Sequence, residues 1–368
     1  MSNPANPGPI VRPGILDIAP YVGGESKAHG ASRVIRLAAN EGALGPSPHA
    51  IAAYQALAPE LHRYPDGNSG ELREAIAECH GLDVSRIVCG TGSDELITLL
   101  ARLYAGPGDE VVYSRHGFLM YPLAAMSVGA KPVAAPESNL TADIDALLAA
   151  VTPQTKLVFL ANPNNPTGTY LPDAEIRRLH AGLPPHVVLV LDAAYAEFVD
   201  AADYESGIAL VEAAANVIML RTFSKIFALG GLRIGWGYAS PAIADALNRI
   251  RGVFNISSAG QAAATAAIRD RAFLERSRTH NKTWRHWTIG ALRELGLEVV
   301  PSVTNFVLVR FPDDPRRNAD SVWNALKRDG ILTRKMHSYG LPQHLRITIG
   351  TEEEMRIIVA AIAESLGS

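Results

Sequence analysis

Lys225 is the only lysine in the segment RTFSKIFALGGLRIGW, residues 221–236, which is rich in apolar residues and glycine. An ammonium group loses hydration when it is buried, so a lysine in an apolar pocket often serves as a nucleophile or Schiff-base former. A lysine beside an apolar run more often extends its side chain to water, so its neighbours must decide. Thr222, Ser224 and Arg233 offer two hydroxyls and a planar cation, which together suit a phosphate dianion.

The segment GTGSDE, residues 90–95, indicates a second group that would face an anion. Its glycines allow a sharp turn after the strand-like run RIVC, and we expect Ser93 or Asp94 to cap the helix that follows. The first N–H groups of that helix would then point at an anion. A plain strand-to-helix turn explains this segment equally well, and Arg233 alone equally suits a structural ion pair.

Three further polar residues follow apolar runs and could hold one aromatic ligand. Asp192 ends VVLVLD, where an unpaired carboxylate is costly, so it should face a cation or a protonated ring nitrogen; capping the following helix is the equal alternative. Asn165 lies in NPNNPTG, which a tight turn also explains, and Tyr195 lies in DAAYAEF. Asn165 and Tyr195 could both hydrogen-bond one phenolic oxygen.

These groups together describe pyridoxal 5'-phosphate, which carries a phosphate, an aldehyde, a pyridine nitrogen and a phenolic oxygen. The protein contributes the Schiff-base lysine and an aspartate that keeps the ring nitrogen protonated, so that the ring can accept electrons. We therefore expect Lys225 to hold the cofactor and, once displaced by substrate, to move the Cα proton as a base.

The elements that would position these residues alternate along the chain from about Ser47 to Ser240. Short runs that are apolar throughout, such as KLVFLAN and VIMLRT, are separated by helical patterns such as SDELITLLARLYA. This alternation predicts an α/β fold with a mostly parallel sheet flanked by helices on both faces. Ligands bind beyond the carboxyl ends of such strands, where the segments of Ser93, Asn165, Asp192 and Lys225 should meet.

The remainder of the chain predicts a smaller α+β domain. Helical patterns fill roughly residues 241–295, and LEVVPS, NFVLVRF, GILTR and LRITIG read as strands around two more helices. We predict a large cofactor-binding domain over residues 46–255. The small domain is predicted to combine residues 1–45 with residues 256–368.

The composition favours an enzyme that acts on small molecules. The 368 residues are 48% hydrophobic with a formal net charge of −3, and no run of one charge sign suggests nucleic acid or an anionic membrane. Two cysteines, Cys79 and Cys89, are too few for disulfide bonds to stabilise a chain of this length. Neither a signal peptide nor a long apolar run is evident, so we expect a soluble cytoplasmic protein. The 11 histidines form no metal-binding spacing, so no metal is predicted.

The sequence resembles the fold type I pyridoxal-phosphate aminotransferases of class I and II, and among them most closely the histidinol-phosphate aminotransferases. The resemblance covers nearly the whole chain and is carried by HRYPD, GSDE, NPNNPTG, DAAYAEF, RTFSKIFALGGLRIG and LRITIGT in this order. It implies transamination of L-histidinol phosphate with 2-oxoglutarate to imidazole-acetol phosphate and L-glutamate, a step of histidine biosynthesis. It also implies a homodimer with shared active sites.

The resemblance also implies roles for particular residues. Lys225 would be catalytic and hold the cofactor, Asp192 would pair its ring nitrogen, and Asn165 and Tyr195 would bind its phenolic oxygen. The phosphate would be surrounded by Ser93, Asp94, Thr222, Ser224 and Arg233, joined by Tyr64 from the other subunit. Substrate would be bound through Arg346 at its carboxylate, with Arg334 and Tyr21 near its distal group. Phe118 would stack on the ring, although His116 is close enough to take that place.

Two segments depart from the family pattern near the expected mouth of the site. This chain has ANEGALGPSP where the family often has an asparagine-proline-aromatic sequence. It has SRHGFLMYP where the family more commonly has a sequence similar to PTYGMY. These departures leave an aromatic-amino-acid aminotransferase with the same catalytic residues as the nearest alternative. A phospho-amino-acid decarboxylase on the same frame is a second alternative, and a regulatory cofactor-binding module is disfavoured because no basic helix-turn-helix segment precedes the domain.

Overall fold

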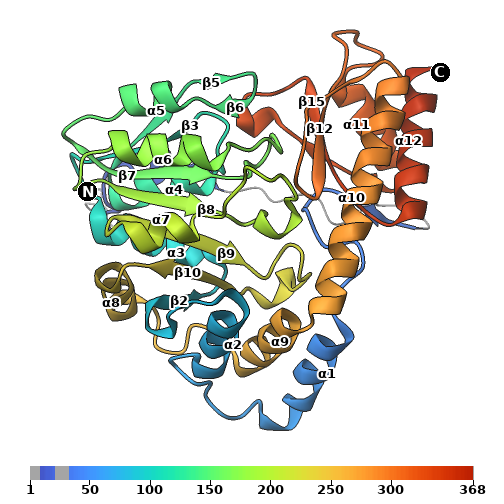
Figure 1. Cartoon of the computed structure of the whole chain (residues 1–368). Coiled ribbons are helices and arrows are strands. Elements are labelled where there is room, and N and C mark those ends of the chain that lie inside the picture. The colour runs from blue at the N-terminus through green and yellow to red at the C-terminus, as the bar shows by residue number, and fades with distance from the viewer. Residues whose placement is uncertain (1–8, 21–32, 368) are drawn as a thin grey trace, which may run out of the picture.

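The computed structural model describes residues 9–20 and 33–367. Its centre is a seven-stranded sheet flanked by helices on both faces (Figure 1). Only β10 runs antiparallel to its neighbours, so the sheet is mostly parallel, as the sequence predicts. In spatial order the strands are β2 (Ile87–Gly90), β10 (Gly235–Ala239), β9 (Val217–Thr222), β8 (Val188–Asp192), β7 (Thr155–Ala161), β3 (Glu110–Ser114) and β4 (Lys131–Ala135).

Apolar side chains on both sides of each strand explain why the sheet is covered twice. In β7, Val158 and Leu160 enter one core while Leu157 and Phe159 enter the other, because successive strand residues point to opposite faces. The first core is covered by α1 (Pro48–Ala56), α2 (Gly70–His80), α5 (Ile144–Ala149), α6 (Asp173–Gly182), α7 (Ile208–Ala213) and α9 (Ser258–Arg269). The second is covered by α3 (Ser93–Tyr104), α4 (Met120–Val128) and α8 (Pro241–Ile250).

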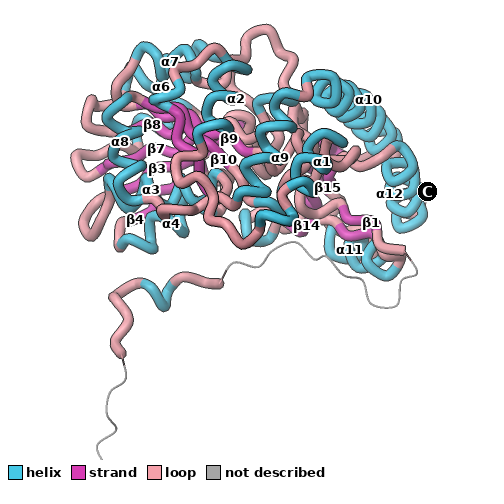
Figure 2. The backbone as a smooth tube through the Cα atoms, turned by 90° about the horizontal axis from the view of Figure 1, so that it is seen from below, coloured by secondary structure: helices cyan, strands magenta, loops and turns pink. Residues whose placement is uncertain are grey.

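A second sheet lies in the C-terminal part, beside the helices that Figure 2 shows gathered at one end of the molecule. Its antiparallel strands are β11 (Glu298–Val299), β12 (Phe306–Arg310), β15 (His344–Thr348) and β14 (Arg334–Lys335). The helices of this part are α10 (Arg271–Glu294), α11 (Ala319–Arg328) and α12 (Glu352–Leu366). Thr351 and Glu354 form a reciprocal capping box that fixes the start of α12.

The N-terminal segment joins this C-terminal part. Strand β1 (Ile35–Arg36) pairs in parallel with β13 (Ile331–Leu332), and a separate hairpin is formed by β5 (Glu137–Ser138) and β6 (Thr141–Ala142). The run GILTR was expected to form one strand, but it is split between β13 and β14, because its two halves pair with different partners. Helix α9 packs on α1 and α2, although the predicted boundary assigns it to the smaller domain, and the division of the chain stays a prediction.

Short 3-10 turns complete the chain at η1 (Ile15–Asp17), η2 (Ala58–Glu60), η3 (Val84–Arg86), η4 (Ala196–Phe198), η5 (Gly230–Leu232) and η6 (His337–Tyr339). Within residues 9–20 and 33–367, no helix combines the length and the apolar character that crossing a membrane requires.

Candidate active site

Segments that follow β2, β7, β8 and β9 meet at one edge of the large sheet. The strand directions explain this, because β2, β7, β8 and β9 all end at that edge, whereas β10 begins there. The segments enclose a cavity of about 100 Å³. The predicted residues that line it are Ser93, Asp94, Phe118, Asn165, Asp192, Tyr195, Thr222, Ser224, Lys225 and Arg233. We call this space the inner cavity.

Lys225 lies on a turn that follows β9 and is anchored by buried side chains. Phe223 and Ile226 on either side of it are at most 3% exposed, whereas Lys225 itself is partly buried. The backbone N–H of Ala228 donates to the Lys225 carbonyl at 3.0 Å and closes the turn. The Nζ atom lies 5.6 Å from the centroid of the Tyr195 ring. The lysine is therefore held against an aromatic wall of the inner cavity.

The anion-binding end of the cavity is organised around Arg233. Its Nη2 donates to Asp94 Oδ2 at 2.9 Å, and its Nη1 donates to Ser224 Oγ at 3.2 Å. A Cβ atom on Gly92 would lie 2.7 Å from Nη2 of Arg233, so a side chain at this position would displace the guanidinium. The arginine, a hydroxyl and the start of α3 thus lie together.

The expected cap of α3 is wrong. Neither Ser93 nor Asp94 caps this helix; Gly92 holds the N-cap position with φ of 75°, and no side-chain cap bond is formed. The turn needs a left-handed φ at this point, which glycine adopts without strain, so the helix begins one residue earlier than a serine cap would allow. The side chain of Ser93 lines the cavity instead.

Asp192 ends β8 with a buried carboxylate. The Tyr121 hydroxyl donates to its Oδ2 at 2.8 Å, and the backbone N–H of Ala194 donates to its Oδ1 at 3.3 Å. Burial raises the pKa of Asp192 to about 6, although these two hydrogen bonds act to lower it. The carboxylate stabilises a local turn and does not cap a regular helix, because η4 begins only at Ala196. A cation in the cavity would therefore be stabilised by Asp192.

Arg346 connects the small sheet to the inner cavity. It lies on β15, is 7% exposed, and its Nη1 donates to Asn165 Oδ1. Its Nη2 donates to the Ala38 carbonyl at 2.9 Å, and its guanidinium carbon lies 5.2 Å from the centroid of the Phe306 ring. These contacts hold the planar fork beside the cavity, with Asn165 between the arginine and the cavity.

Phe118 and His116 take different positions. Phe118 lines the inner cavity, whereas the His116 Nδ1 atom lies 2.7 Å from Glu137 Oε2. The same carboxylate accepts hydrogen bonds from the His116 N–H and the Ser114 hydroxyl. These hydrogen bonds to the carboxylate outweigh the opposing effect of burial and lower the pKa of Glu137. Phe118 is thus placed where a ring in the cavity would meet it.

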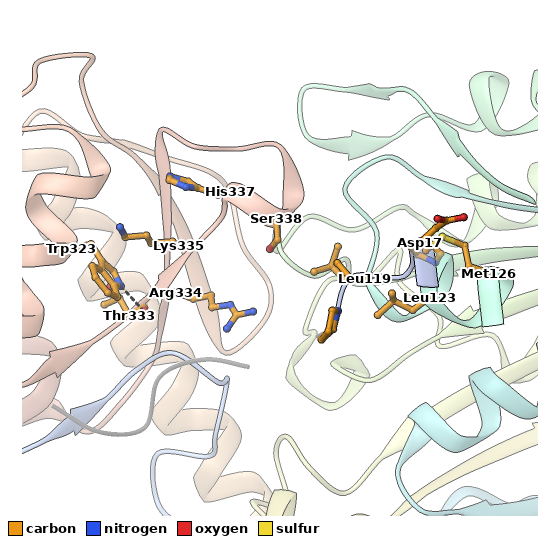
Figure 3. Close-up of a pocket in the computed structure, with 13 residues that line it drawn as sticks. Asp17, Leu119, Leu123, Met126, Trp323, Thr333, Arg334, Lys335, His337 and Ser338 are labelled. Carbon is orange, nitrogen blue, oxygen red and sulfur yellow. Dashed lines mark hydrogen bonds between the residues drawn. The ribbon is translucent and has the colours of Figure 1, made fainter. Parts of the chain in front are cut away.

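A second, larger space of about 640 Å³ lies beyond Phe118, and we call it the outer cavity. Figure 3 shows Arg334, Lys335 and His337 on one side of it and the apolar side chains of α4 on the other. Lys335 pairs with Asp320 at 2.7 Å and lies 4.2 Å from the centroid of the Trp323 ring. Arg334 therefore lines the outer cavity, apart from the ten residues of the inner one.

One predicted residue lies elsewhere in the structure, and another falls outside its described part. Tyr64 is 83% exposed, stacks on Phe254 with 4.8 Å between ring centroids, and lines neither the inner nor the outer cavity. Tyr21 falls outside the described residues. Among the described residues, no group of three or more His, Cys, Asp or Glu side chains is placed to hold a metal ion.

Sequence reasoning missed Asn40 and Tyr121. Asn40 donates through Nδ2 to the Tyr195 hydroxyl at 2.9 Å, and Tyr121 donates to Asp192. Asn40 adopts a left-handed φ of 57°, which asparagine tolerates better than most residues, and an isolated asparagine after LAA gives only this weak signal. Tyr121 lies inside an apolar helix, where an aromatic residue reads as ordinary core.

Comparison with known proteins gives consistent matches. A sequence profile described as aminotransferase class I and II matches residues 32–362. The histidinol-phosphate aminotransferase of Paramagnetospirillum magneticum is 58% identical over 360 residues, which cover 98% of this chain and 99% of that protein. The enzyme of the same name from Rhodospirillum centenum is 59% identical over 359 residues, with the same coverage. The crystal structure of histidinol-phosphate aminotransferase from Sinorhizobium meliloti in complex with pyridoxal-5'-phosphate has a TM-score of 0.89 at 32% identity, covering 97% of each chain.

Proposed function

This chain belongs to the class I and II aminotransferases, and from that premise we propose that it transfers the amino group of L-histidinol phosphate to 2-oxoglutarate. The products are imidazole-acetol phosphate and L-glutamate, and the reaction is a step of histidine biosynthesis. The cofactor is pyridoxal 5'-phosphate, which supplies an electron-accepting ring and carries the amino group between the two substrates.

The residues of the inner cavity fit the two ends of this cofactor. Arg233, Ser224 and the uncapped start of α3 offer donors to a phosphate dianion, and Thr222 adds a second hydroxyl. At the other end, burial raises the pKa of the Asp192 carboxyl, so a positive charge placed beside it in the cavity would favour its ionised form. A protonated pyridine nitrogen would supply that charge.

Lys225 performs two tasks in this proposal. Its Nζ atom holds the cofactor covalently and later takes and returns the proton at the Cα atom of the amino donor. The Nζ atom lies 5.6 Å from the centroid of the Tyr195 ring, and both residues line the inner cavity. Asn165 and Tyr195 would bind the phenolic oxygen of the cofactor, and Phe118 would pack on its ring.

Arg346 and Arg334 divide the recognition of the substrates. Arg346 would bind the carboxylate of the 2-oxo acid or of glutamate through its planar fork, which matches two oxygens at once. Histidinol phosphate has no carboxylate, and its phosphate would reach the cations of the outer cavity, of which Arg334 is one. The apolar wall formed by Leu119, Leu123 and Met126 would face the remaining part of the substrate.

The observation that carries the proposal is the meeting of Lys225, Asp192 and Asn165 in one cavity, with Arg346 bonded to Asn165. These residues come from three strand ends of the large sheet and one strand of the small sheet. A lysine, a buried acid, an amide and a carboxylate-binding arginine are the groups that transamination on this cofactor needs.

A homodimer with shared active sites belongs to the same proposal. Tyr64 and Phe254 form an exposed aromatic pair, and Leu61 and Val253 nearby in sequence are each 72% exposed. Such a group of exposed apolar side chains suits a protein interface. Tyr64 would there reach the cofactor phosphate of the other subunit. Cytoplasmic location is proposed as well, since Cys79 and Cys89 are both unpaired.

The test is glutamate formation by purified protein saturated with the cofactor. With 2-oxoglutarate present, L-histidinol phosphate should give glutamate with a kcat/KM at least about tenfold above that for L-phenylalanine, because a phosphate–arginine pair is worth more than about 1.4 kcal/mol. Preference for phenylalanine would contradict the proposed donor. Release of carbon dioxide without consumption of the 2-oxo acid would contradict transamination itself.

A further inference from the structure

Asn40 is buried between Tyr195 and β15 and makes hydrogen bonds with every polar group it carries. The residue is 1% exposed, its Nδ2 donates to the Tyr195 hydroxyl at 2.9 Å, and its backbone N–H donates to Thr348 Oγ1 at 2.9 Å. Thr348 Oγ1 in turn donates to Asn40 Oδ1 at 3.2 Å, and Asn305 Nδ2 donates to the Asn40 carbonyl at 3.0 Å. The asparagine side chain is therefore fixed at both ends.

The directions of these hydrogen bonds follow from the chemistry of the groups. A backbone N–H only donates, so the Thr348 oxygen accepts from Asn40, and the threonine proton is left to point at Oδ1. The other orientation of the Asn40 amide would place its NH2 group against Thr348 and leave the threonine proton without the Oδ1 acceptor, so the network favours the orientation in which Oδ1 faces Thr348. Its NH2 group must face Tyr195, where it only donates. The Tyr195 oxygen is an acceptor in this bond, and its own proton must point away from Asn40.

The protonated state of Tyr195 supports this reading of the bond. Burial raises the pKa of Tyr195 to about 12, so its hydroxyl keeps its proton at neutral pH and has one hydrogen bond to donate. The Tyr195 side chain lines the inner cavity together with Asn165 and Lys225. The cavity is where a partner for that proton would lie.

We propose that Asn40 and Thr348 are positioning residues that direct the Tyr195 hydroxyl proton into the inner cavity, toward the phenolic oxygen of the cofactor. The inference rests on the proposed function, because it needs the cofactor in that cavity. Thr348 lies two residues from Arg346 on β15. The strand that carries the proposed carboxylate-binding arginine therefore also fixes which group donates and which accepts in the hydrogen bonds from Thr348 through Asn40 to Tyr195.

The expected consequence is electrostatic. A hydrogen bond from Tyr195 draws negative charge from the phenolic oxygen, and that oxygen in turn stabilises the proton on the Lys225 nitrogen. Losing the bond should therefore raise the apparent pKa that governs the pH-dependent colour of the bound cofactor. Because a hydrogen bond to a charged oxygen is among the stronger kinds, we expect a rise of about one unit.

Asn40→Asp reverses the bond without changing its shape. A carboxylate accepts from Thr348 and from Tyr195 alike, so the tyrosine proton would turn toward position 40 and leave the cavity. Aspartate tolerates the left-handed φ of 57° about as well as asparagine does. The added negative charge also raises the apparent pKa, so the same substitution is made in a Tyr195→Phe background, where there is no hydroxyl to turn.

The measurement is a spectrophotometric pH titration of the cofactor-loaded protein for all four members of this cycle. We expect Asn40→Asp to raise the apparent pKa by about one unit more when Tyr195 is present than when it is replaced by phenylalanine. Equal shifts in the two backgrounds would overturn the inference, because charge alone would then explain them.

Thr348 provides an independent pair of variants in case Asn40→Asp does not fold. Thr348→Val removes the hydroxyl that fixes the Asn40 amide and should raise the apparent pKa, whereas Thr348→Ser retains the hydroxyl and should stay at the wild-type value. A valine variant with an unchanged titration would overturn the inference. If the wild-type protein takes up no cofactor, the proposed function fails; if it turns yellow while the variants show no shift, only this inference fails.

Discussion

The inner and outer cavities differ in how their walls are built. The inner cavity is formed by residues that directly follow strands of one sheet, and its polar side chains bond to one another, as Arg233 does to Asp94 and Ser224. The outer cavity, about six times larger at 640 Å³ against 100 Å³, is enclosed by η1, α4, β14 and η6. The polar groups of the inner cavity are held in place by one another. The outer cavity has cationic side chains on one side and mainly apolar side chains, together with Asp17, on the other.

This difference suggests a division between catalysis and selectivity. Changes in the inner cavity should affect every amino donor alike, because all donors share the same amine chemistry. Changes in the outer cavity should separate donors that carry a phosphate from donors that do not. Variants of the two regions can therefore test whether catalysis and the choice of amino donor depend on different cavities.

The largest effect is expected from Lys225→Ala in the inner cavity. Loss of the amine removes both the covalent attachment of the cofactor and the base, so turnover should fall by about four orders of magnitude for every donor. Reduction with borohydride followed by mass spectrometry should find no labelled residue in the variant. A label at another lysine would show that the site has been assigned to the wrong residue.

A smaller effect is expected from Asp192→Asn, measured as stability of the cofactor-free protein. Folding raises the pKa of Asp192 from 3.8 to about 6, so the folded state favours the protonated acid. The resulting stabilisation is present below pH 4 and is lost as the pH rises through 6. Relative to the variant, the wild-type protein should lose about 2 kcal/mol of unfolding free energy between pH 4 and pH 7.

Denaturant titrations at these two pH values, with and without pyridoxal phosphate, would measure the change. Bound cofactor should abolish most of the loss, because its protonated ring nitrogen would pair with the ionised carboxylate. A difference between wild type and variant that is independent of pH would contradict the assignment of a buried, uncompensated acid.

The smallest effect should come from the outer cavity and should be selective. Arg334→Gln should lower kcat/KM for L-histidinol phosphate by about tenfold to a hundredfold, the range for a lost charged hydrogen bond, and leave L-phenylalanine unchanged. Lys335→Gln is the matched control: Lys335 already pairs with Asp320 at 2.7 Å, so its loss should matter less than about threefold. Equal losses for both donors would show that Arg334 does not select for phosphate.

Much of the inner cavity could be predicted from the sequence, because its residues lie at the ends of strands. Asp192 ends β8, and Asn165 and Lys225 follow β7 and β9 within four residues. Because the carboxyl ends of parallel strands lie at one edge, their meeting was predictable. The mostly parallel sheet followed from strands that are apolar on both faces. The turn before α3 was less well predicted, because the choice between a serine cap and a glycine cap depends on one backbone angle.

Contacts between segments that are distant in the chain could not be predicted from the sequence. Asn40 meets Tyr195 across 155 positions of the chain and Thr348 across 308, and no local pattern carries that information. The outer cavity likewise depends on how the N-terminal segment and β14 approach α4. The sequence allows either His116 or Phe118 as the ring-stacking residue, and only the structure shows the contact between His116 and Glu137.

The most direct test of the account is the visible absorption spectrum of the purified protein before and after L-histidinol phosphate is added, with no 2-oxo acid present. We expect a yellow protein whose colour bleaches as the cofactor is converted to its amine form. One equivalent of cofactor should be converted per subunit. A yellow protein that keeps its colour with histidinol phosphate, and bleaches with L-phenylalanine, would contradict the proposed donor.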